Sequence, residues 1–377
     1  MDKKAAFIHS RKLDEGGYPM DCPFDSRRAG RTHATISSLG LLHMANTRLV
    51  EPAPLSDEEL ALFHTADYLE VLQRAGRGVH DFKALKKGLG TPDCPLFKDM
   101  FEFVSLAAGG TVTGTKLVLN GEADISFNPS GGFHHASADS ASGFCYINDL
   151  VIAAEIAARA GKRVMIIDLD AHHGDGTQAA FYPRSDVITL SMHESGKTLF
   201  PGTGFEEEIG EGEGKGYSIN VPLPVGTYDA IYYTTFKEVV LPLVDALSPD
   251  LLILPLGMDP LAGDPLAHLN LTNNVFADIV ADIVELDKPI VATGGGGYNV
   301  QNTIRAWSLI WSIFANGRDD SMAALGMGGV MLENTAWFGG LRDRTLLSHG
   351  GYRDSVDKEV RGVIDKIKKL IFPMHGL

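Results

Sequence analysis

Short apolar runs alternate along this chain with longer stretches in which apolar residues recur every three or four positions. Several of the short runs are β-branched and apolar at successive positions, which is typical of parallel strands covered by helices on both faces. The short runs predict strands at residues 5–9, 123–127, 163–169, 186–191, 218–223, 250–256 and 289–293. The longer stretches predict helices at residues 149–160, 229–247, 274–286, 303–315 and 355–371.

This alternation predicts an α/β fold with a doubly wound, mostly parallel sheet flanked by helices. The chain has 377 residues, of which 44% are hydrophobic, so it can bury a large core. Large α/β folds of this length often form one domain, and the sequence contains no repeat, low-complexity tract or long linker. We therefore expect residues 1–377 to form a single domain.

Charge and cysteine content narrow the class of protein. The net charge of −15 and the pI of about 5.3 disfavour direct nucleic acid binding and favour cationic partners. Three cysteines without a C-x-x-C pair argue against a disulfide framework. The N-terminal residues lack a signal-peptide core, and no segment approaches the roughly 18–20 apolar residues of a membrane span. We expect a soluble, cytoplasmic protein without membrane contact.

Polar motifs follow four of the predicted strands, at the edge where open α/β sheets bind their ligands. The segment Asp168-Leu-Asp170-Ala-His172 ends strand 163–169, and alternate side chains of an extended segment share one face. Asp170 and His172 could therefore reach one metal ion together with Asp259, which follows strand 250–256. Two carboxylates and an imidazole suit a catalytic zinc site, although an isolated D-x-H is more often a hydrogen-bonded turn.

A second motif, Gly-Gly-Phe-His134-His135-Ala, carries two adjacent histidines after a glycine-rich turn. Such a pair is by itself more often structural than catalytic. A catalytic imidazole needs a carboxylate that fixes its tautomer and raises its basicity. Asp168 and Asp175 flank the proposed ligands, so each could serve one histidine.

Together, six motifs resemble the zinc-dependent histone deacetylase family, which has the arginase/deacetylase fold. They are GGFHHA, SGFCYINDL, DLDAHHGDGT, SMH with LFPGTG, GMDPLAGDP and GGGGYN, in the family's order between Asp93 and Asn299. The absence of long extensions resembles the compact prokaryotic members, including the acetoin-utilisation type. The resemblance implies a hydrolase that removes acyl groups from N-ε-acyl-lysine, with Zn²⁺ held by Asp170, His172 and Asp259.

The resemblance also assigns catalytic roles. His135, oriented by Asp175, is expected to be the general base for the metal-activated water and then the acid for the leaving amine. His134, oriented by Asp168, is its electrostatic partner. Tyr298, after the glycines, is the expected hydroxyl donor to the substrate carbonyl and the oxyanion, a contact whose loss typically costs about 10²–10³ in rate.

Substrate and ion contacts follow from the same resemblance. The tunnel for an acyl-lysine stem would be lined by Gly143, Phe144, Phe200 and Leu266, and the rim aspartate that accepts from substrate amides would be Asp93. A structural K⁺ is implied, with ligands from Asp168 and Ser191 and from the backbone of Asp170, His172 and Met192. The expected partner is an acylated lysine peptide or protein, or an acetylated small amine.

Three alternatives stay open. An acetylpolyamine amidohydrolase would use the same chemistry, but Leu266 stands near the place where polyamine-specialised eukaryotic relatives carry a glutamate. A dinuclear manganese ureohydrolase would share the fold but would need further Asp and His ligands. An acyl-lysine-binding scaffold without turnover is disfavoured by the intact set of site residues. The sequence does not predict the oligomeric state.

Neighbouring residues are expected to be structural. Cys145 is expected in the core because no base is free to activate it, and His173 beside the ligands is expected to support the site. His193 could form a hydrogen bond beneath the site. Arg27 or Arg28 could guard a cavity under the zinc, as an arginine does in relatives. Residues 202–216 and 326–329 are predicted loops, and the lysines of 355–371 a solvated face.

Overall fold

The computed structural model describes residues 3–318, 340–344 and 350–377. Within them, eight strands form one sheet in the order β2-β1-β3-β8-β7-β4-β5-β6, and every neighbouring pair is parallel. The strands are β1 (Ala5–Ile8), β2 (Thr47–Val50), β3 (Ile125–Asn128), β4 (Val164–Asp168), β5 (Val187–Glu194), β6 (Ser218–Leu223), β7 (Leu251–Pro255) and β8 (Ile290–Thr293). The seven predicted strands are confirmed, and the edge strand β2 is an addition.

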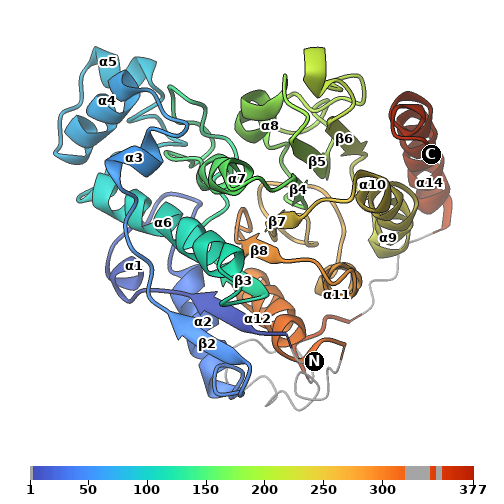
Figure 1. Ribbon diagram of the computed structural model, residues 1–377, viewed down its shortest axis with the longest axis horizontal. Coiled ribbons are helices and arrows are strands. Elements are labelled where there is room, and N and C mark those ends of the chain that lie inside the picture. Colours follow the sequence, from blue (N-terminus) through green and yellow to red (C-terminus); the bar gives the residue numbers. More distant parts are fainter. Residues whose placement is uncertain (1–2, 319–339, 345–349) are drawn as a thin grey trace.

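Helices cover both faces of this sheet (Figure 1). The N-terminal part contributes α1 (Lys12–Glu15), α2 (Arg28–Ser38), α3 (Asp57–Leu60), α4 (Ala66–Gly76), α5 (Phe82–Lys86) and α6 (Met100–Leu119). The remainder contributes α7 (Asp149–Arg159), α8 (Asp175–Phe181), α9 (Asp229–Thr235), α10 (Leu241–Leu247), α11 (Asn273–Glu285), α12 (Val300–Asn316) and α14 (Gly350–Leu370). Single turns η1 (Gly212–Gly214) and η4 (Phe372–Met374) and the π-helical η2 (Phe236–Val240) complete the described elements.

The two-sided burial of β4 explains its uninterrupted apolar run. Met165 and Ile167 pack in the core cluster that contains residues of α11, α12 and α14. Val164 and Ile166 point to the opposite cluster, which contains residues of α6 and α7. All four side chains are at most 1% exposed, as the predicted doubly wound sheet requires.

The helices of the N-terminal third were harder to predict. In α6, buried positions surround the helix axis and include three glycines, so an apolar stripe is missing.

The predicted helix 229–247 is confirmed as a continuous helical run, but η2 interrupts its α-helical geometry between α9 and α10. The predicted glycine-rich loop at 326–329 lies outside the described residues.

The C-terminal helix α14 packs on the sheet through Val360, Ile364 and Ile367, as its periodicity predicted. Lys358 and Lys369 are exposed, as expected of a solvated face, whereas two other lysines form ion pairs. Lys366 pairs with two glutamates of the 202–216 loop, and Lys368 lies 2.7 Å from a carboxylate oxygen of Glu238. The three cysteines are free. No helix in the described part of the chain is long and apolar enough to cross a membrane.

Candidate metal and catalytic site

The site forms where β8, β7, β4 and β5 end beside one another. Parallel neighbours carry their following residues to one edge, so segments far apart in sequence meet there. Asp170 and His172 follow β4, and Asp259 follows β7. Gly296 follows β8 and approaches from the next strand.

Three buried side chains that can each offer a metal-ligand atom face one another at this edge. The Nδ1 atom of His172 lies 2.8 Å from Oδ2 of Asp259 and 3.2 Å from Oδ1 of Asp170. One ligand atom from each residue can be chosen so that all lie within 4.8 Å of one another. The predicted metal-ligand residues are therefore brought together.

Backbone amides hold both carboxylates in place. The Gly296 N–H donates to Oδ2 of Asp170 at 2.6 Å, and the Ala171 N–H donates to Oδ1 of Asp259 at 2.8 Å. A Cβ atom on Gly296 would lie 2.0 Å from Oδ2 of Asp259. Only glycine lets the chain after β8 pass this close to the carboxylates, which explains that part of the glycine run.

The electrostatics of this cluster fit a divalent cation. Burial and the neighbouring Asp170 carboxylate raise the pKa of Asp259 to about 7, because two carboxylates in a dry site repel each other. A cation between them removes that conflict. Two carboxylates and one imidazole nitrogen are a donor set that zinc accepts, so the residues fit the predicted metal.

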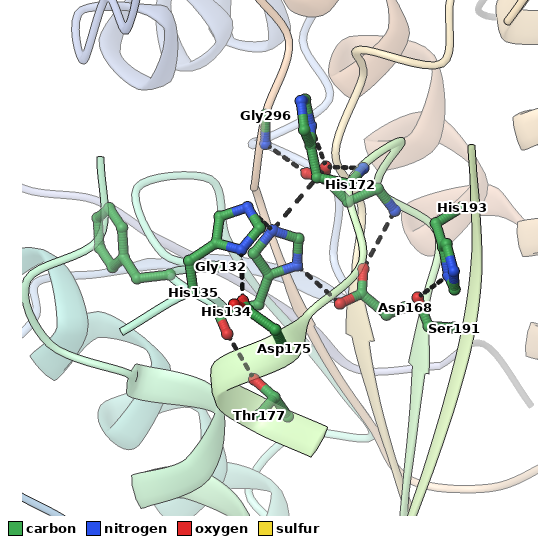
Figure 2. A network of polar contacts seen from close by, with 12 residues as sticks. Gly132, His134, His135, Asp168, His172, Asp175, Thr177, Ser191, His193 and Gly296 are labelled. Atoms are coloured by element: carbon green, nitrogen blue, oxygen red, sulfur yellow. Dashed lines mark hydrogen bonds and ion pairs between the residues drawn. The ribbon is translucent and has the colours of Figure 1, made fainter. Parts of the chain in front are cut away.

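Two histidine–aspartate pairs adjoin the cluster, as Figure 2 shows. Nδ1 of His134 lies 2.8 Å from Oδ2 of Asp168, and Nδ1 of His135 lies 2.7 Å from Oδ1 of Asp175. The two Nε2 atoms are 3.0 Å apart. Each carboxylate thus fixes one imidazole in the predicted pairing, and the free nitrogens of both rings meet beside the metal-ligand residues.

The two imidazoles have opposite proton affinities. Burial lowers the pKa of His134, but the Asp168 and Asp170 carboxylates outweigh burial and raise it to about 9. Burial, the neighbouring His134 and other groups lower the pKa of His135 to about 4, despite the opposing effect of Asp175. At neutral pH this arrangement favours a protonated His134 beside a neutral His135.

The histidine segment is anchored by residues that the sequence analysis did not single out. The Asn148 side-chain amide donates to the carbonyls of His134 and Ala136, at 3.2 and 3.0 Å. The buried Asp149 carboxylate accepts from the N–H groups of Gly132 and Phe133. Both residues lie in the SGFCYINDL motif, whose family resemblance was the available signal for them.

Tyr298 approaches from the segment after β8. Its ring centroid is 6.3 Å from that of His172, and its backbone N–H donates to Oδ2 of Asp264 at 2.7 Å. Burial and the site carboxylates raise the pKa of Tyr298 well above its usual value. Its hydroxyl is therefore a proton-bearing donor at neutral pH. Asp264, which also accepts from Leu266 N–H, was not predicted as a site residue.

Aromatic and glycine residues border the histidines. The Phe200 ring centroid is 5.0 Å from that of His135, and Phe144 lies 5.7 Å from Tyr298 by the same measure. A Cβ on Gly143 would lie 2.4 Å from Cδ2 of His135, so this position admits no side chain without displacement. Phe200 is 46% exposed and Leu266 is half-buried.

Asp93 contacts this border directly. Its carboxylate accepts from the Gly143 N–H at 3.0 Å and from the Thr91 hydroxyl at 2.7 Å. Its backbone carbonyl accepts from the Phe144 N–H. Asp93 thus holds the glycine turn, and each of its oxygens has a further lone pair for another donor.

The predicted potassium residues belong to β4 and β5 and to the segment that follows β4. Asp168 and Ser191 are register partners on β4 and β5, and a cavity of about 10 Å³ adjoins both. The Ser191 hydroxyl lies 2.8 Å from Nδ1 of His193, as Figure 2 shows, and Nε2 of His193 lies 2.9 Å from the carbonyl oxygen of Gly204. Met192 is buried on β5 between Ser191 and His193.

The supporting residues differ in role. Cys145 is buried and burial raises its pKa well above the usual value, in agreement with a core thiol. Nδ1 of His173 lies 2.8 Å from the Thr203 hydroxyl. Arg28 is buried within α2 and donates to the carbonyls of Gly295 and Gly297, whereas Arg27 is largely exposed and pairs with Asp25. Of these two arginines, only Arg28 reaches the site.

Comparisons with known proteins agree with this geometry. The model of the histone deacetylase domain matches residues 22–314. The chain is 37% identical over 317 residues to acetoin utilization protein AcuC of Bacillus subtilis, across 82% of this chain and 81% of that protein. It is 37% identical over 289 residues to histone deacetylase 8 of Xenopus tropicalis, across 76% and 78% respectively.

Solved structures give the same result. The crystal structure of an HDAC homologue from Aquifex aeolicus matches with a TM-score of 0.84 and 33% identity, over 97% of this chain and all of that one. The structure of an HDAC homologue complexed with SAHA matches with the same values. The family resemblance and the arginase/deacetylase fold are confirmed. With its Asp170–His172–Asp259 metal site, this hydrolase belongs to the histone deacetylase family.

Proposed function

We propose that this protein is a zinc-dependent lysine deacylase that hydrolyses the amide bond of N-ε-acyl-lysine, with acetyl-lysine as the first candidate substrate. One observation carries the proposal. The Asp170–His172–Asp259 cluster, the two histidine–aspartate pairs and Tyr298 adjoin one another at the same sheet edge. This combination supplies a metal site, a base and an oxyanion donor for one amide.

The role that we propose for each histidine follows from its proton affinity. Zinc, when bound, supplies a Lewis acid that polarises the acyl carbonyl and activates water. His135, which is neutral, takes a proton from the attacking water and later gives one to the leaving lysine amine. Asp175 accepts from Nδ1–H of His135 and thereby leaves the basic lone pair of this ring on Nε2. Protonated His134, paired with Asp168, stabilises developing negative charge.

Tyr298 completes the chemistry as the hydroxyl donor to the carbonyl oxygen. Its high pKa keeps the proton on the hydroxyl throughout the relevant pH range. Such a donor stabilises the oxyanion more than the ground-state carbonyl, because negative charge develops on that oxygen.

Gly143, Phe144, Phe200 and Leu266 are proposed to line the path of the acyl-lysine stem, with Asp93 at its outer end. Lysine carries four methylenes, which apolar side chains accommodate without an unsatisfied polar group. Leu266 offers no charge to a second ammonium group, so we propose acyl-lysine over acetylated polyamines. The net charge of −15 agrees with a basic peptide partner.

We also propose a structural K⁺ beside Asp168 and Ser191, with backbone oxygens of Asp170, His172 and Met192 as further ligands. The pairing of β4 with β5 and the small adjoining cavity support it. A cytoplasmic location remains a prediction. We treat residues 1–377 as one domain, because a single sheet receives strands from residue 5 to residue 293.

Kinetic profiling tests the substrate. Zinc-loaded protein is assayed with acyl-lysine peptides of increasing acyl length, acetylated polyamines, arginine and agmatine. The proposal predicts the highest kcat/KM on an acyl-lysine peptide. Preference for acetylated polyamines would identify the polyamine alternative, whereas arginine or agmatine hydrolysis with two manganese ions per chain would identify a ureohydrolase. Binding of acyl-lysine without any turnover would indicate a scaffold.

A further inference from the structure

Glu194 is a fully buried carboxylate that the proposed mechanism does not use. It is the last residue of β5 and is 1% exposed. We propose that Glu194 is a positioning residue that holds the Phe200 and Leu266 sides of the acyl path together and thereby sets which acyl groups fit. This inference rests on the proposed function, because Phe200 and Leu266 line the path only in that proposal.

The first connection runs to the Phe200 side. The Thr198 hydroxyl donates to Oε1 of Glu194 at 3.0 Å, and its oxygen lies 3.1 Å from the carbonyl oxygen of Ser195. The Leu199 N–H donates to the same Ser195 carbonyl, so residues 195–199 form a compact turn. Phe200 follows this turn directly and packs on His135. Its position therefore depends on a turn that the Glu194 carboxylate fastens.

The second connection runs to the Leu266 side. The backbone N–H of His268 donates to Oε2 of Glu194 at 2.7 Å, and Nδ1 of the same residue lies 3.0 Å from Oε1. His268 is two residues beyond Leu266, whose own N–H donates to Asp264. The loop that carries Leu266 is thus fastened at both ends, on one side by Asp264 and on the other by Glu194.

Glu194 is itself rigidly placed. Its backbone N–H donates to the carbonyl of Ala171, between the metal-ligand residues Asp170 and His172. Its Cα is in register with Leu223 of β6. Glu194 therefore links the loop that carries Phe200 and the loop that carries Leu266 to the segment that holds the metal site.

The energetics favour this role over an incidental contact. A buried carboxylate is costly unless several donors satisfy it, and removing the acceptor leaves those donors unpaired. Here a hydroxyl, a ring nitrogen and a backbone N–H from two separate loops converge on one carboxylate. Its loss weakens the connections to both loops, whereas loss of the Thr198 hydroxyl or of the His268 ring weakens the connection to one loop only.

Three variants separate the connections. Glu194→Gln removes the negative charge that serves both loops and leaves one acceptor oxygen instead of two. Thr198→Val removes only the Phe200-side donor, and His268→Ala removes the ring donor on the Leu266 side but keeps the backbone N–H. Glu155→Gln is the matched control. Glu155 lies on α7, outside the site, and its mostly buried carboxylate pairs with Arg159 of the same helix and with Arg184.

Hydrogen–deuterium exchange measures the positioning without reference to activity. In Glu194→Gln, exchange should accelerate about tenfold or more in peptides covering both 195–204 and 264–271. Thr198→Val should affect only the first peptide, His268→Ala only the second, and Glu155→Gln neither. Unchanged exchange in both peptides of Glu194→Gln would overturn the inference. Should Glu194→Gln not fold, the two single-loop variants decide: unchanged exchange in either would overturn it.

Acyl selectivity measures the consequence. The ratio of kcat/KM for hexanoyl-lysine to that for acetyl-lysine should rise about tenfold in Glu194→Gln, less in each single-loop variant and not in Glu155→Gln. Equal losses on both substrates would overturn the selectivity role. If wild-type protein hydrolyses no acyl-lysine peptide, the proposed function fails, while the exchange pattern still decides whether Glu194 joins the two loops.

Discussion

The floor and the rim of the site are built in different ways. We define the floor as Asp170, His172, Asp259, His134 and His135, and the rim as Asp93, Phe200 and Leu266. Floor residues are at most 7% exposed and are fixed by strand ends and backbone amides, whereas Phe200 is 46% exposed. Sheet register thus determines where the chemistry occurs, while contacts between loops determine what can reach it.

This difference has energetic consequences. Because the floor is buried away from water, its charges and hydrogen bonds interact strongly. Small displacements of its side chains should therefore raise the free energy of the transition state. In the proposed function, rim contacts compete with water and form with substrate already in the ground state, so we expect them to contribute mainly to binding. Floor substitutions should therefore lower kcat, and rim substitutions should raise KM.

The largest expected effect is on the floor, in His135→Ala. Loss of the general base and acid should lower kcat about 10²–10⁴-fold, because no other neutral imidazole adjoins Nε2 of His134 in the described structure. Initial rates on an acetyl-lysine peptide measure the loss, and atomic absorption should find zinc retained. The exposed His80→Ala serves as control. Near-normal kcat in His135→Ala would disprove the assigned role.

Tyr298→Phe should follow, with kcat about 10²–10³-fold lower and KM changed little. The ring can keep its packing on Phe144, so only the donated proton is lost. Steady-state kinetics separate kcat from KM. In the control Tyr233→Phe the lost hydroxyl contacts Asp282, away from the site, and kcat should be unchanged. A rise in KM alone would instead give Tyr298 the binding role that we expect of the rim residues.

We expect a fall in pH to lower the stability of the protein through protonation of the buried His64. Its Nε2 accepts from the Asn148 N–H, and burial lowers its pKa to about 4. Because the folded-state pKa is below the unfolded value of about 6.5, stability is complete above that pH and falls as pH drops toward 4, by about 3 kcal/mol in total.

Urea unfolding of wild type and His64→Gln at pH 7 and pH 5 measures this effect. Between those pH values wild type should lose about 2 kcal/mol more than the variant, since only wild type carries the buried imidazole. Equal losses in both proteins would show that other groups cause the acid sensitivity.

The smallest expected effect is on the rim, in Asp93→Ala. Losing the acceptor for substrate amides should raise KM about tenfold, the equivalent of roughly one charge-assisted hydrogen bond, with kcat within about twofold. The exposed Asp245→Ala on α10 is the control. A large fall in kcat would indicate instead that Asp93 acts through Gly143, which contacts it at 3.0 Å.

The difference between floor and rim also explains which features could be predicted from the sequence. The metal-ligand pair Asp170 and His172 is encoded within one short segment, and period-two geometry at a strand end is a local property. The strands were predictable because they are apolar on both faces. The edge strand β2 was missed because none of its residues is buried and Leu49 is 50% exposed, so it lacks an apolar run.

Other features depend on contacts that local patterns do not contain. Glu194 and His268 are 74 positions apart, and neither belongs to a recognisable spacing. Asp264 holds Tyr298 from 34 positions away. The assignment of Phe200 and Leu266 to the acyl path came only from the family resemblance. Tertiary pairing of loops, rather than chain periodicity, places these residues.

The account depends most on the metal cluster of Asp170, His172 and Asp259, and metal removal tests it most directly. Protein dialysed against a chelator is titrated with Zn²⁺ while acetate release from an acetyl-lysine peptide is followed. Activity should disappear with the metal and return to a plateau at one zinc per chain. Full activity in protein that atomic absorption finds free of metal would contradict the account.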